Sequence, residues 1–95
     1  MFLNPINKIG LPAVLEQCAE ECTELAKVNL KMARKLRGEN PTPKTMDKIN
    51  QELIEEIADV LVCIDILLDE VVSRDDVTSV MLEKRFRWNE RLTEN

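Results

Sequence analysis

The sequence predicts an all-α fold, in which an antiparallel helical hairpin and a third helix complete a multi-helix bundle by homo-oligomerisation. The 95 residues allow one small domain, and they include only two glycines, four prolines and no tyrosine. Apolar residues recur with the spacing of helix faces rather than in alternation. A domain of this size buries a modest fraction of its surface, so a partner subunit is an expected source of further burial.

The first ten residues are predicted to form an irregular leader, because Asn4-Pro5 and Gly10 interrupt helices. The apolar side chains of this leader are expected to pack onto the bundle: Phe2, Leu3, Ile6 and Ile9. Residues 11–37 then carry apolar side chains at i, i+3 and i+4 spacing, which predicts the first long helix. Gly38 suits the C-terminal end of that helix.

A proline-containing stretch, residues 39–43, predicts the loop between the first long helix and a second helix over residues 44–72. Residues 60–68 of the second helix are apolar on nearly every side, apart from Asp65. A helix that is apolar all round has to be covered all round. One hairpin partner and one short helix do not supply that cover, so we expect a homodimer or a homotetramer.

The third predicted helix spans residues 74–92. Ser73 precedes the acidic Asp76 by three residues, which is the capping-box pattern of a helix start. The sequence contains no internal repeat and no low-complexity tract. Residues 1–95 are therefore predicted to form a single domain.

Charge and composition exclude several classes of function. The net charge is −5, which argues against a nucleic-acid backbone binder, because such proteins need a basic surface. Histidine is absent, which removes histidine-based catalytic triads. Three cysteines and no secretory signal favour the reducing cytoplasm and buried structural thiols over disulfides or zinc. The longest apolar stretch is too short to cross a membrane.

Two acidic pairs suggest a shared site. Glu21 and Glu24 lie three residues apart on the first long helix, as Glu56 and Asp59 do on the second. The two pairs are equally far in sequence from position 40, within the predicted loop. In an antiparallel hairpin they would therefore lie level with each other, roughly 25 Å from the turn at about 1.5 Å of rise per residue.

Acidic clusters on helices usually face solvent, and that interpretation carries weight here too. Asp59 differs because apolar residues flank it on both sides, so we expect its side chain to point toward packed surface. A buried carboxylate has to be neutralised, paired or bound to a metal. The first long helix supplies further acids, so pairing with it would increase the repulsion unless a cation were bound. The pattern therefore favours a hard divalent cation with oxygen ligands, such as Mg²⁺.

The acidic pairs resemble the signature of the MazG-like, all-α nucleoside triphosphate pyrophosphohydrolases. The matching segments are Glu20-Glu21-x-x-Glu24-Leu25-Ala26 and Glu55-Glu56-x-x-Asp59-Val60-Leu61. The resemblance implies a hairpin that binds Mg²⁺, with Mn²⁺ as a substitute, through Glu21, Glu24, Glu56 and Asp59. It further implies cleavage of a nucleoside triphosphate to the monophosphate and pyrophosphate. Glu20 is our candidate for the general base or for a residue that orients a metal ligand, with Glu52 and Glu55 as supporting acids.

Substrate phosphates also need cationic and amide partners. Lys31 follows the first acidic pair along its helix, and the resemblance indicates Lys84, Asn89 and Arg91 on the last helix. A solvated basic stripe explains any single one of these residues equally well. The substrate therefore stays open between a nucleoside triphosphate and phosphoribosyl-ATP. A third interpretation is a non-catalytic helical module whose acidic face binds a basic partner.

Overall fold

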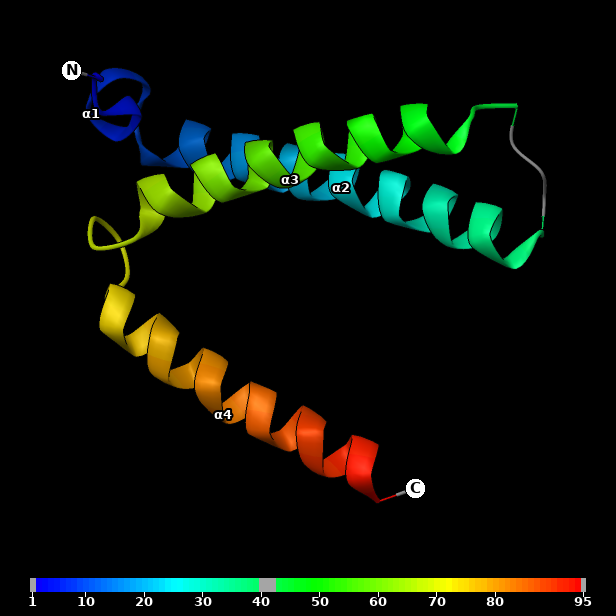
Figure 1. Ribbon diagram of the computed structural model, residues 1–95. Helices are drawn as coiled ribbons and strands as arrows, with labels where there is room; N and C mark the ends of the chain where they lie inside the picture. The colour runs from blue at the N-terminus through cyan, green and yellow to red at the C-terminus, as the bar shows by residue number, and fades with distance from the viewer. Residues whose placement is uncertain (1, 40–42, 95) are drawn as a thin grey trace.

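The computed structural model describes residues 2–39 and 43–94. The secondary-structure elements in these two ranges are four α-helices (Figure 1). This confirms the predicted all-α class. The helices are α1 (Pro5–Ile9), α2 (Leu11–Arg37), α3 (Met46–Leu67) and α4 (Arg74–Thr93). The predicted loop residues 40–42 lie outside the described residues.

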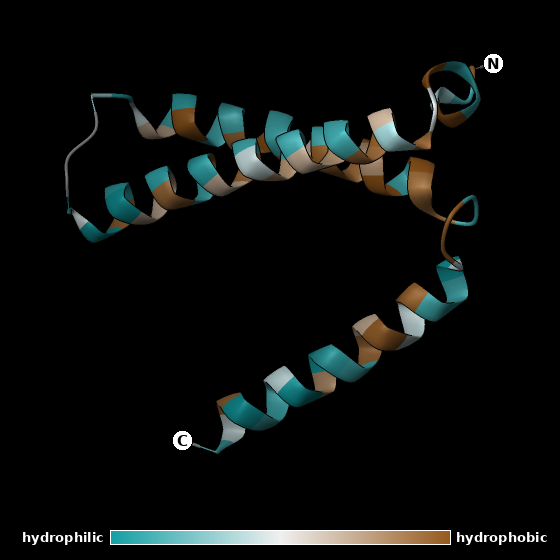
Figure 2. Ribbon diagram, turned by 180° about the vertical axis from the view of Figure 1, so that it is seen from behind, coloured by the Kyte–Doolittle hydropathy of each residue, from teal (hydrophilic) through white to brown (hydrophobic). Residues whose placement is uncertain are grey.

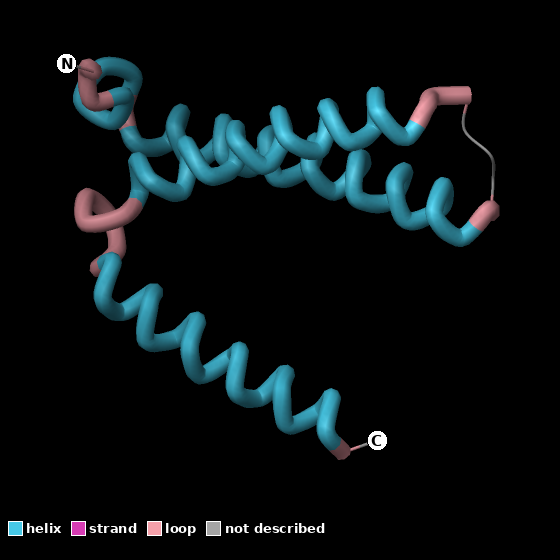
Figure 3. The backbone as a smooth tube through the Cα atoms, viewed as in Figure 1, coloured by secondary structure: helices cyan, strands magenta, loops and turns pink. Residues whose placement is uncertain are grey.

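Helices α2 and α3 run antiparallel and pack along much of their length (Figures 1 and 3). The buried residues lie on the facing sides of these two helices: Val14, Val28, Ile49, Val60 and Cys63. Ile49 has no exposed surface at all. The hairpin therefore holds the core, and it brings the two predicted acidic stretches to neighbouring positions.

The prediction of an irregular leader is wrong for residues 5–9, which form the short helix α1. Asn4 caps α1, since its Oδ1 accepts a 2.9 Å hydrogen bond from the Ile6 N–H. The next residue is a proline, whose missing N–H costs nothing in the first turn of a helix. Gly10, with φ of 92°, then allows the change of direction into α2.

The predicted packing of the leader onto the bundle holds only in part. Ile6 is half-buried, and α1 packs against α2. In contrast, Phe2 is 100% exposed, Leu3 is 75% exposed and Ile9 is 59% exposed. Among the described residues, no further element covers these side chains.

The second long helix is shorter than the predicted 44–72. Its N-cap is Thr45, and its last helical residue is Leu67. Beyond it the chain turns at Asp69, which has the left-handed φ of 69° and donates its N–H to the Val72 carbonyl. The Asp69 carboxylate also accepts the Arg74 N–H at 2.9 Å, so it caps the following helix instead of continuing the previous one.

Helix α4 begins with the predicted capping residue. Ser73 Oγ accepts a 3.2 Å hydrogen bond from the Asp76 N–H. The helix then runs away from the hairpin, so that the last turn of α4 lies apart from α2 and α3 (Figure 1). None of the residues in α4 is buried, and Val77 alone is half-buried.

The chain is too extended for a compact monomer. Its radius of gyration is 16.9 Å, whereas a compact domain of 95 residues has about 12 Å. Its accessible surface is 7820 Å², compared with about 5,600 Å² for a folded monomer of 10.9 kDa. Among the described residues, no helix is both long and apolar enough to span a membrane.

Candidate metal centre

Three of the four predicted metal ligands come together on the hairpin. Glu21 on α2 and Glu56 and Asp59 on α3 each offer one carboxylate oxygen, and these three oxygens lie within 4.8 Å of one another. We call these residues the carboxylate cluster. Glu21 lies 35 positions before Glu56 and 38 before Asp59 in the sequence, so the cluster exists only because α2 and α3 pair in this register.

Glu56 is the least satisfied member of the carboxylate cluster. Its Oε2 atom is shielded from solvent and has no hydrogen-bond partner among the described residues. Burial raises the pKa of the Glu56 carboxyl, and the nearby charges of Asp59 and Glu21 raise it further. A shielded oxygen without a partner, beside two other carboxylates, matches what an oxygen-binding cation such as Mg²⁺ needs.

The expectation that Asp59 faces packed surface is wrong, because its side chain is exposed. The neighbouring Val60 and Cys63 take the buried positions on α3 instead. Only some residues of each helical turn face the partner helix, so a residue with apolar neighbours in the sequence can still be exposed. Asp59 nevertheless reaches the carboxylate cluster from the cluster's exposed side.

Glu24 and Glu20 lie outside the carboxylate cluster. The Glu24 carboxylate approaches Lys27 Nζ at 3.7 Å, and the Glu24 side chain is 53% exposed. Its charge still contributes to the raised pKa of Glu56, so it is close to the cluster. Glu20, the predicted general base, is exposed on α2.

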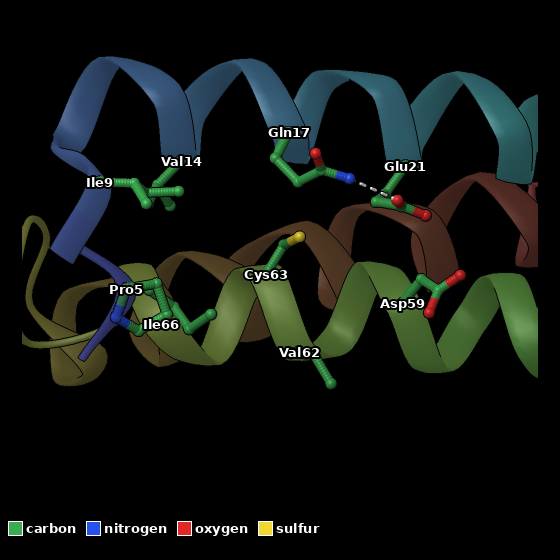
Figure 4. Close-up of a pocket in the computed structure, with 9 residues that line it drawn as sticks. All are labelled: Pro5, Ile9, Val14, Gln17, Glu21, Asp59, Val62, Cys63 and Ile66. Carbon is green, nitrogen blue, oxygen red and sulfur yellow. Dashed lines mark hydrogen bonds between the residues drawn. The ribbon is translucent and has the colours of Figure 1, made fainter. Parts of the chain in front are cut away.

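Gln17 is a residue of this site that the sequence analysis did not identify. Its Nε2 donates a 2.8 Å hydrogen bond to Glu21 Oε1, one turn further along α2 (Figure 4). Gln17, Glu21 and Asp59 also border a pocket of about 300 Å³. The remaining lining is largely apolar and comes from α1, α2 and α3: Pro5, Ile9, Val14, Val62, Cys63 and Ile66. The i, i+4 spacing of Gln17 and Glu21 was the signal that could have identified this pair.

Lys31 has a partner away from the carboxylate cluster. Its Nζ lies 3.3 Å from Glu52 Oε2, and both side chains are largely shielded from solvent. Lys44 contacts the other Glu52 oxygen, and its hydrogen bond lowers the pKa of Glu52 most strongly. Lys31 thus links α2 to α3, while Glu55 is exposed and accepts a 3.5 Å hydrogen bond from Gln51.

The predicted phosphate-binding residues of the last helix are not near the carboxylate cluster in a single chain. Lys84, Asn89 and Arg91 are exposed on α4, which diverges from the hairpin (Figure 1). Lys84 and Arg91 share a shallow groove with Trp88. These side chains would reach a carboxylate cluster only if α4 packed on a hairpin.

The three cysteines differ in exposure. Cys63 is buried and Cys18 is half-buried, as expected for structural thiols. Burial and a hydrogen bond with Cys18 raise the pKa of the Cys63 thiol to about 11, which keeps it protonated at neutral pH. Cys22 is exposed, contrary to the prediction, because it lies on the solvent side of α2.

Comparison with known proteins identifies no relative: no family model, curated protein or solved structure matches this chain.

Proposed function

We propose that this protein is a Mg²⁺-dependent nucleotide pyrophosphohydrolase, which cleaves a nucleoside triphosphate to the monophosphate and pyrophosphate. The observation that carries this proposal is the carboxylate cluster, in which Glu56 has a shielded oxygen without a partner. The MazG-like acidic signature of the sequence supports the same assignment. The proposal includes a homo-oligomer, for which the extended chain and its exposed apolar residues provide support.

Glu21, Glu56 and Asp59 would hold the cation, and all three supply oxygen atoms, the ligand type that Mg²⁺ prefers. When bound, Mg²⁺ neutralises phosphate charge and makes a coordinated water more acidic. Gln17 would keep Glu21 in its binding rotamer through the 2.8 Å hydrogen bond. These roles require no histidine.

In the proposed reaction, a water oxygen forms a bond to the α-phosphorus while the bond from that phosphorus to the α,β-bridging oxygen breaks. The electron pair of the broken bond leaves with pyrophosphate. Glu20 would accept the proton of the attacking water, as the exposed acid nearest in sequence to Glu21. Lys84 and Arg91 would bind phosphate oxygens and Asn89 would contact the base or a phosphate, provided that α4 packs on a hairpin. Lys31 would separate from Glu52 when substrate binds and would contact a phosphate oxygen instead.

Calorimetric titration with Mg²⁺ tests the metal site directly. We expect wild-type protein to bind Mg²⁺, and Glu56→Gln and Asp59→Asn to bind at least about 100-fold more weakly, since even outer-shell substitutions cost 10–100-fold. Glu16→Gln, an exposed acid on α2, is the matched control and should bind normally. Absence of Mg²⁺ binding by the wild type would leave a non-catalytic interaction module as the better interpretation.

Release of pyrophosphate from a panel of nucleoside triphosphates tests the reaction. Phosphoribosyl-ATP belongs in the panel because the same site would cleave it, and Mn²⁺ should replace Mg²⁺. We expect activity with at least one of these substrates, and loss of it in Glu56→Gln and Asp59→Asn but not in Glu16→Gln. Mg²⁺ binding without turnover of any substrate would contradict the enzymatic proposal.

A further inference from the structure

The end of the hairpin nearest the N-terminus carries an uncovered apolar surface. Leu61, Val62 and Ile64 on α3 are 57%, 60% and 42% exposed. Together with Phe2 and Leu3 they line a groove of about 1090 Å³. Hydrophobic residues gather on α3 and the turn that follows it (Figure 2). We call this surface the α3 groove. Contiguous exposed apolar surface of this kind marks an interaction site.

Helix α4 has an apolar stripe of its own that is exposed except at Val77, which is half-buried. The stripe residues share one face at helical spacing: Val77, Val80, Met81, Trp88 and Leu92. Met81 is 63% exposed and Leu92 is 66% exposed. Most of the stability of a helix in a protein comes from the packing of its apolar face, so α4 would gain stability from a packing partner.

The junction between α3 and α4 holds α4 away from its own hairpin. Arg74, the first residue of α4, places one guanidinium nitrogen 3.2 Å from Asp65 and another 3.2 Å from Asp69. Its N–H also donates to Asp69. These three bonds, all of them exposed to solvent, connect the start of α4 to the end of α3.

The amount of uncovered surface indicates a second copy of the same chain as the partner. One chain exposes roughly 2,200 Å² more than a compact monomer of its mass. Burial of that excess on both copies would remove about 4,400 Å², within the range of roughly 2,000–5,000 Å² for obligate homodimers. We infer that α4 of each copy packs its apolar stripe into the α3 groove of the other.

This exchange would also bring charge to the carboxylate cluster, a consequence that depends on the proposed function. Between Lys84 and Arg91, α4 carries four basic residues and one acidic residue. The α3 members of the carboxylate cluster, Glu56 and Asp59, lie five and two residues before Leu61 of the α3 groove. These basic residues of α4 lie three to ten residues beyond Met81. A helix docked along α3 from the second copy would therefore offer the cations that each cluster lacks in a single chain.

Light scattering and disulfide trapping test the docking. We expect a dimer that Leu61→Glu converts to monomer, whereas Leu36→Glu, the same change at the far end of the hairpin, leaves it intact. Oxidation of the double variant Val62→Cys/Met81→Cys should give a covalent dimer, with the two single variants as controls for the native thiols. A monomeric wild type, or a Val62–Met81 link within one chain, would overturn the inference.

Mixing two inactive variants tests whether α4 acts in trans. One variant carries Glu56→Gln and the other carries Lys84→Ala/Arg91→Ala. In an exchanged dimer, each heterodimer of the two variants has one site with an intact hairpin and an intact α4. Half of the dimers in an equal mixture are heterodimers, so we expect about a quarter of wild-type activity. An active wild type with no recovery on mixing would refute action in trans while leaving the proposed function standing. An inactive wild type would instead refute the proposed function, and the trapping experiment would still decide the docking.

Discussion

Gln17 Nε2 donates a 2.8 Å hydrogen bond to Glu21 Oε1, and this bond orients the one cluster carboxylate that comes from α2. The other two cluster carboxylates come from α3. The relative positions of the three oxygens therefore depend both on helix pairing and on this side-chain contact.

Gln17→Ala should weaken Mg²⁺ binding by about 10-fold or more, because the partners that orient a metal ligand typically contribute 10–100-fold to affinity. Gln51→Ala is the matched control, since Gln51 makes the same i, i+4 contact with Glu55, at 3.5 Å, outside the cluster. Titration calorimetry measures both variants. Equal affinities for the two variants would show that Glu21 needs no orientation by Gln17.

Glu24→Gln should reduce Mg²⁺ affinity less than Glu21→Gln does. Glu21 belongs to the carboxylate cluster, whereas the Glu24 carboxylate is half exposed and lies 3.7 Å from Lys27. We expect at least about 100-fold weaker binding for Glu21→Gln and about 10-fold or less for Glu24→Gln. Comparable losses would mean that Glu24 turns away from Lys27 and completes a four-carboxylate site, as the sequence signature implies.

The stability of the metal-free protein should fall as pH rises above 4.5, the ordinary glutamate pKa. Over this range the folded chain retains the Glu56 proton that the unfolded chain has released, because the folded-state pKa is raised. Glu56→Gln should remove this decline and make the metal-free protein more stable than wild type at neutral pH. Denaturant titrations between pH 4.5 and 7.5 measure both effects, and an unchanged pH profile would contradict the assignment.

Glu52 should produce the opposite dependence in a different range. Its pKa is lowered by hydrogen bonds from Lys44 and Lys31, so its contribution is complete above 4.5 and is lost as pH falls through the lowered value. Glu52→Gln should therefore reduce the acid sensitivity of the folded protein below pH 4.5 and leave the decline in stability above pH 4.5 intact.

Mg²⁺ affinity should rise with pH above 4.5, because Glu56 has to lose its proton before it can bind the cation.

Ile49→Ala should destabilise the fold by about 2–5 kcal/mol, the usual cost of truncating a fully buried aliphatic side chain. Ile49 has no exposed surface, whereas Ile54, further along the same helix, is 53% exposed in the single chain. Ile54→Ala is the control and should cost much less. Denaturant unfolding of both variants checks this, and similar losses would show that the oligomer buries Ile54.

The sequence by itself determined the all-α class, the position of the first long helix and the start of the last one. Leu11–Arg37 forms α2 because its apolar residues keep helical spacing up to Gly38, and Ser73 caps α4 through a local hydrogen bond. Such signals act within a few residues, so they can be read without knowledge of the fold. The equal sequence separation of the acidic pairs from position 40 likewise indicated that they meet.

Only the tertiary structure decided which side chains form the site. Helix pairing buries one face of α3, and this leaves an oxygen of Glu56 shielded and Asp59 exposed, although it is Asp59 that has apolar neighbours on both sides. Glu24 stays outside the carboxylate cluster, and Gln17 donates a hydrogen bond to its member Glu21. The end of α3 at Leu67 depends on the contacts of Asp69 with Val72 and Arg74. Apolar periodicity records which residues avoid water, but the rotation and register of the packed helices decide which carboxylates share a site.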